Sequence, residues 1–102
     1  MMTGISFDLA IQIIMEKGTG LHKITDDFYV FAESWDVICV EKECEGLSGS
    51  EFDECAFSHA EWVTFEVIPK ELEEEGFEVI ESRLVDVGDA PYGTSIVLLR
   101  RR

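Results

Sequence analysis

Two cysteines and a histidine in the middle of the chain are the residues best suited to metal chemistry. Cys55 and His59 are four positions apart, so a helix would place them on one face, and Cys44 is near enough in sequence to fold back toward them. With Glu61 as a fourth ligand, these residues would form a zinc set. Structural zinc sites prefer closely paired ligands such as C-x2-C, and the chain has no such pair. We therefore expect no metal and no cofactor, and interpret the cysteines as small buried hydrophobic residues.

The pair Cys55 and His59 could also serve as a nucleophile and its base. The many surrounding carboxylates disfavour the thiolate that such a nucleophile needs. The chain has three cysteines, the third being Cys39, and three cannot all pair within one chain, so we expect reduced thiols. An enzyme that uses Cys55 and His59 is the third of three hypotheses, and the prediction is that the protein is not an enzyme.

Two glycine-containing segments resemble catalytic loops only in part. Gly18–Gly20 lacks the Gly-Lys-Ser/Thr ending of a phosphate-binding loop. Gly46–Gly49 resembles a nucleophile elbow, but Ser50 stands where that motif needs glycine. Both segments are interpreted as ordinary loops.

The chain is strongly acidic, with 22 Asp and Glu against 8 Lys and Arg and a net charge of −14. Most of the excess lies between Glu41 and Asp86, and carboxylates this numerous do not single out an acid–base pair. The same segment is rich in large apolar residues, so it should fold and not behave as a solvated tail. These residues are Phe52, Phe57, Trp62, Val63, Phe65, Val67, Ile68, Phe77, Val79 and Ile80.

A folded domain with this charge repels nucleic acid and anionic membranes and attracts basic surfaces. The leading hypothesis is a small acidic binding protein that docks on a basic, nucleic-acid-handling protein and inhibits or regulates it, its carboxylates replacing phosphates. Folded acidic decoys, including nucleic-acid mimics encoded by phages and mobile elements, have this general composition, although no motif connects the chain to them. The predicted partner-binding residues lie on two helices: Glu51, Asp53 and Glu54 on the first, and Glu71, Glu73, Glu74 and Glu75 on the second.

The alternative hypothesis is a structural or homo-oligomeric protein whose acidity gives only solubility. Trp35, Trp62 and Tyr92 would then be the candidates for an apolar interface, although tryptophans are more often found in cores. The basic cluster Arg100–Arg102 is interpreted as a solubilising end or a small counter-charge.

Length and composition predict one domain over 1–102, since 102 residues at 46% hydrophobic content can bury a modest core. The early apolar run Leu9–Met15 follows Asp8 instead of a basic segment, which argues against a signal peptide. The apolar runs are too short to span a bilayer, so we expect a cytoplasmic protein without membrane association.

Hydrophobic periodicity predicts an α+β fold. Apolar residues recur at helical spacing from Phe7 to Ile14, with Ser6 as N-cap and Gly18 as the stop signal, which predicts a helix over 6–17. The other expected elements are strands over 21–25, 28–31, 35–40, 62–68, 77–87 (with a bulge near 81–83) and 94–99, helices over 51–60 and 70–75, a loop over 45–50 and a turn over 88–93. Together they predict an antiparallel sheet with the N-terminal helix and one or two short helices packed on one face.

Overall fold

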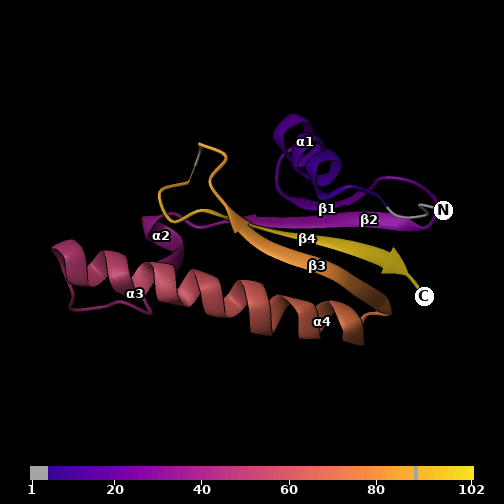
Figure 1. Ribbon diagram of the computed structural model, residues 1–102. Coiled ribbons are helices and arrows are strands. Elements are labelled where there is room, and N and C mark those ends of the chain that lie inside the picture. Colours follow the sequence, from indigo (N-terminus) through magenta and orange to yellow (C-terminus); the bar gives the residue numbers. More distant parts are fainter. Residues whose placement is uncertain (1–4, 89) are drawn as a thin grey trace.

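An antiparallel sheet of four strands in the order β1-β2-β4-β3 organises the computed structural model, which describes residues 5–88 and 90–102 (Figure 1). The strands are β1 (Gly20–Lys23), β2 (Phe28–Ser34), β3 (Phe77–Val85) and β4 (Thr94–Arg101). The central strand β4 is buried from Thr94 to Leu99 and pairs with β2 and β3. The predicted α+β class is confirmed. Asp89, in the predicted turn over 88–93, lies outside the described residues.

The helix α1 (Phe7–Lys17) covers one face of the sheet, as Figure 1 shows. Ser6 caps it, since its Oγ accepts a hydrogen bond from the Leu9 N–H at 3.2 Å, and Gly18 ends it with a positive φ of 86°. These caps confirm the helix predicted over 6–17. Its core residues pack with alternate residues of β2 and β4: Phe7, Ala10 and Ile14 with Val30, Ala32, Ile96 and Leu98.

A long helix covers the opposite face, so helices lie on both faces and not on one as expected (Figure 1). It consists of α3 (Gly49–Trp62), the π-helical segment η1 (Val63–Val67) and α4 (Ile68–Glu74), which follow one another without a break. The predicted strand over 62–68 is therefore wrong. Pro69 lies in the first turn of α4, directly after the wider π turn.

The predicted strand over 35–40 is also wrong, because this segment contains the one-turn helix α2 (Val37–Val40). Asp36 starts this turn, since its carboxylate accepts a hydrogen bond from the Cys39 N–H at 3.0 Å.

A chain of buried hydrogen bonds fixes the long helix to β4. The Trp35 indole N–H donates to Ser95 Oγ at 2.8 Å, and the Ser95 and Thr64 hydroxyls lie 2.5 Å apart. The Thr64 hydroxyl in turn donates to the Ala60 carbonyl at 2.6 Å. Each hydroxyl can accept one bond and donate the next, so no polar atom of this buried chain is left unpaired.

The C-terminal arginines extend β4 two residues beyond the predicted end at 99. Arg100 pairs with Phe28 of β2, and Arg101 pairs with Phe77 of β3. The Arg101 N–H also donates to the Asp27 carbonyl at 2.7 Å. These two residues therefore belong to the sheet.

Candidate functional site

All seven predicted partner-binding residues lie on the long helix or at its end. Glu51, Asp53 and Glu54 are on α3, and Glu71, Glu73 and Glu74 are on α4, with Glu75 as the C-cap. All seven are exposed. Because residues 63–67 are helical, the two predicted acidic clusters lie on one continuous helix. Its span from Glu51 to Glu75, which we call the acidic row, is about 36 Å long at ~1.5 Å per residue.

The charge density of this row can be compared with that of nucleic acid. Nine Asp and Glu lie between Glu51 and Glu75, and Lys70 is the one Lys or Arg there. This corresponds to a carboxylate every ~4–5 Å along the helix axis. A DNA duplex carries one phosphate charge per ~1.7 Å and each strand one per ~3.4 Å. The row thus approaches the charge density of a single strand.

Three aromatic side chains of the long helix are exposed within this acidic row, Phe57, Trp62 and Phe65, and the Phe57 ring packs edge-on against Tyr92. Trp62 is 55% and Phe65 50% exposed. Glu61 is four residues before Phe65 and Glu66 four residues after Trp62, so each aromatic ring neighbours a carboxylate on the helix surface. We call Glu61, Trp62, Phe65 and Glu66 the Trp62 face. Its exposed aromatic area is the kind of surface that protein interfaces use.

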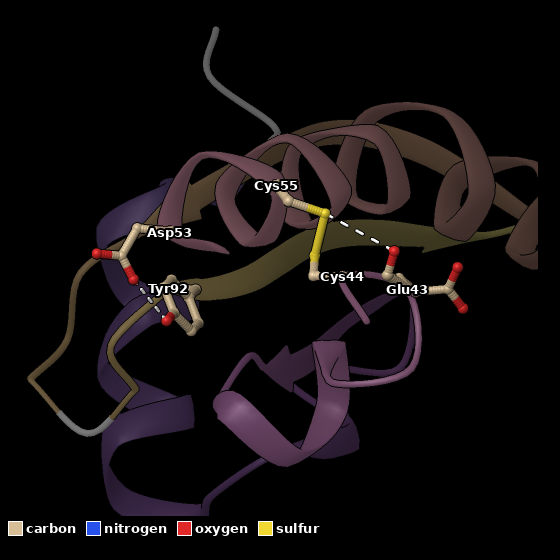
Figure 2. Close-up of a disulfide and its surroundings, with 5 residues drawn as sticks. All are labelled: Glu43, Cys44, Asp53, Cys55 and Tyr92. Atoms are coloured by element: carbon tan, nitrogen blue, oxygen red, sulfur yellow. Dashed lines mark hydrogen bonds between the residues drawn. A yellow bond between two sulfur atoms is a disulfide. The ribbon is translucent and has the colours of Figure 1, made fainter. Parts of the chain in front are cut away.

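Asp53 has a structural contact that its sequence position did not reveal. Its Oδ1 accepts a hydrogen bond from the Tyr92 hydroxyl at 2.8 Å (Figure 2). This hydrogen bond, followed by burial and the nearby carboxylate charge, raises the pKa of Tyr92 above its ordinary value. Asp53 therefore holds the segment before β4 against α3, and is less available to a partner than the other six acidic residues.

The cysteines form a disulfide, so the expectation of reduced thiols is wrong. Cys44 and Cys55 are bonded with Sγ–Sγ 2.12 Å and Cα–Cα 5.9 Å, which joins the segment after α2 to α3 (Figure 2). Cys39 is free and exposed.

The disulfide occupies the sulfur atom on which both chemical alternatives depend. With its sulfur bonded to Cys44, Cys55 offers neither the thiolate of a Cys55 and His59 pair nor a zinc ligand. The His59 ring lies edge-on to Trp35, with centroids 5.5 Å apart, and tilted against Trp62 at 5.8 Å. Within residues 5–88 and 90–102, no three His, Cys, Asp or Glu side chains gather as a metal site would require.

The three candidates for an apolar interface are in different environments. Trp35 and Tyr92 are 5% and 6% exposed, so the proposal that they form an interface is wrong. Trp62 is accessible. In the helix that replaces the strand predicted over 62–68, Val63 and Thr64 occupy the buried positions and Trp62 faces solvent.

A small cavity lies where α4 passes the sheet beside β1 and β2. It has a volume of about 150 Å³. Its apolar lining consists of Leu21, Phe31, Ile68 and Leu72, and its carboxylates are those of Glu33, Glu71 and Glu75. Two of these glutamates, Glu71 and Glu75, are predicted partner-binding residues, whereas Glu33 carried no sequence signal that set it apart.

Neither the comparisons with known proteins nor the helices of the structure indicate what these surfaces bind. No family model, curated protein or solved structure matches this chain. Among the described residues, every helix is too short or too polar to cross a bilayer. Function must therefore be inferred from the acidic row, the Trp62 face and the cavity.

Proposed function

We propose that the protein is a small acidic binding module that docks through the exposed side of its long helix on a basic surface of a nucleic-acid-handling protein, and so inhibits or regulates it. The observation that carries this proposal is the acidic row from Glu51 to Glu75 along one continuous helix, with Trp62 and Phe65 exposed within it. A solubilising coat alone would not require two large aromatic side chains at its centre.

The two kinds of residue have different expected roles in binding. Carboxylates spread along the row attract a basic partner at long range and raise the association rate, an effect that salt weakens. Trp62 and Phe65 can bury apolar area once the complex forms, which slows dissociation. Charge changes should therefore act on the association rate, and aromatic truncations on the dissociation rate.

The first experiment tests the acidic row with a matched pair of variants. A basic partner is first captured from host lysate at low salt, and its binding kinetics are then measured with purified proteins. Glu73→Lys with Glu74→Gln should lower the association rate about tenfold or more at low ionic strength. Gln12→Lys with Glu16→Lys, on α1 across the sheet, changes the net charge by the same amount and should have a much smaller effect. Equal losses in both variants would contradict a defined docking surface.

The second experiment tests the Trp62 face. Trp62→Ala should raise the dissociation rate by about tenfold or more, with little effect on folding because the side chain is half exposed. Met15→Ala is the control, since Met15 is 65% exposed on α1. An unchanged dissociation rate for Trp62→Ala would remove this residue from the interface.

Self-association is a second candidate, and the exposure of Trp62 favours it over the other apolar candidates. A net charge of −14 opposes it, because two copies of the acidic row would repel each other. Sedimentation velocity at low and high salt distinguishes the two. A concentration-dependent dimer that Trp62→Ala abolishes would support the homo-oligomer over the basic partner.

A further inference from the structure

The cavity beside α4 exists because the long helix does not cover the whole sheet. α4 packs mainly against β3, which forms one edge of the sheet. The short strand β1, of four residues, forms the other edge. On this uncovered side, Leu21 of β1 pairs with Phe31 of β2, and Leu72 of α4 approaches them. The result is a recess with an apolar lining that opens toward solvent.

Three glutamates line different parts of this recess. Glu71 and Glu75 are one helical turn apart on α4, and Glu33 lies two residues after Phe31, on the same face of β2. Burial, and then the charge of Glu71, raise the pKa of Glu33 above its ordinary value. The two ion pairs found in the described residues, Lys23 with Asp26 and Arg83 with Glu81, do not involve these three glutamates.

The size of the cavity limits what can occupy it. Binding sites for drug-sized molecules are typically ~300–1,000 Å³, whereas a cavity of ~150 Å³ accommodates a group the size of benzene. At about 150 Å³, the recess therefore fits one side chain and not a nucleotide or a helix.

We propose that this recess receives an arginine side chain of the basic partner. An apolar lining suits the aliphatic stem, and the carboxylates suit the cationic head. Arginine fits better than lysine because its guanidinium is more weakly hydrated, stacks on aromatic rings such as Phe31 and can donate to several carboxylates at once. This inference rests on the proposed function and adds to it an anchor at one end of the acidic row.

The test uses the full chain and a defined probe, acetyl-Gly-Arg-Gly-amide, in a titration followed by NMR. The expected result is saturable shifts at Leu21, Phe31, Leu72 and the Glu33 carboxyl. The lysine peptide should bind at least several-fold more weakly, and the neutral citrulline peptide should produce no shifts. Shifts of equal size along the whole acidic row, or equal binding of the arginine and lysine peptides, would overturn the proposal.

Two double variants separate this inference from the proposed function. Glu33→Gln with Glu71→Gln should abolish the arginine-specific shifts, whereas Glu73→Gln with Glu74→Gln, which removes the same charge outside the recess, should retain them. Amide spectra establish that both variants fold. If the partner binds both variants equally but more weakly than the parent protein, the recess is not its anchor and docking on the helix stands. If the arginine peptide occupies the recess but the partner is insensitive to charge changes on α4, the proposed function fails instead.

Discussion

Glu33 shows how the surroundings of one residue set a pH effect. Its pKa is raised by burial first and by the charge of Glu71 second, while His59 has a smaller opposite influence. The folded state thus holds its proton to a higher pH than the unfolded chain does. Stability is lost as pH rises from the ordinary glutamate value through the raised value.

Glu33→Gln should therefore stabilise the protein at neutral pH and bring no gain near pH 4, where both states are largely protonated. Urea unfolding at the two pH values measures this difference. The control is Glu78→Gln, an exposed position on β3, which should change stability little at either pH. A variant less stable than the parent protein at pH 7 would show that the Glu33 charge is favourable where it lies.

For single residues, the sequence predicted that most carboxylates are exposed, but it did not predict which carboxylate is half-buried. The exposure of Glu51, Glu54 and Glu73 follows from their chemistry, since carboxylates rarely enter a core. The position of Glu33 beside Glu71 depends on a strand and a helix distant in sequence. The bond from Tyr92 to Asp53 likewise joins residues that only the fold brings together.

Helices and strands were predicted correctly where their sequence signals were strong, and wrongly where local propensity and tertiary packing disagreed. The helix over 6–17 was predictable because it has a regular apolar repeat and clear end signals, and the strands over 77–87 and 94–99 were predictable because a clear turn signal separates two apolar runs. Residues 62–68 combine β-branched and aromatic residues in alternation, which mimics a strand. Their packing against β4 favoured a helix, with Val63, Thr64 and Ile68 as its buried residues. Here tertiary contacts overrode local propensity.

The disulfide was not predictable from cysteine count, because an odd number does not indicate which two residues pair. Only the return of the chain after α2 brings Cys44 to Cys55. The loop between them, with Gly46 and Gly49 both at positive φ, permits that return.

Removing the disulfide should destabilise the attachment of α2 to α3. With a sequence separation of 11, the expected loss is up to about 3 kcal/mol in the free energy of unfolding. Cys44→Ala with Cys55→Ala should show this loss in urea unfolding under oxidising conditions, whereas Cys39→Ala should not. Thiol titration of the unreduced protein should count one free thiol, and a count of three would contradict the bond.

Over the whole molecule, the net charge of −14 has opposite consequences for folding and for binding. Repulsion between carboxylates destabilises the free protein, and salt screens it as the Debye length falls from ~30 Å at ~0.01 M to ~8 Å at ~0.15 M.

The melting temperature should therefore rise by a few degrees over this range, at roughly 4–8 °C per kcal/mol for a domain of this size. Binding to a basic partner should weaken over the same range. Calorimetry measures the rise in melting temperature, and binding kinetics on the same samples measure the weakening of partner binding. Glu73→Lys with Glu74→Gln should reduce both effects, and a melting temperature that falls with salt would contradict the repulsion argument.

We expect the irregular pairing of β3 to limit aggregation through the edge of the sheet. β3 forms an edge of the sheet, and its register with β4 shifts between Val79 and Glu81. A long, flat edge strand is a template on which another chain can add as a further strand, and eventually as a fibril. The bulge interrupts that template, and Glu78 and Glu81 add charge on either side of it. The protein can thus expose an apolar helix surface for binding while its sheet edge resists unwanted strand addition.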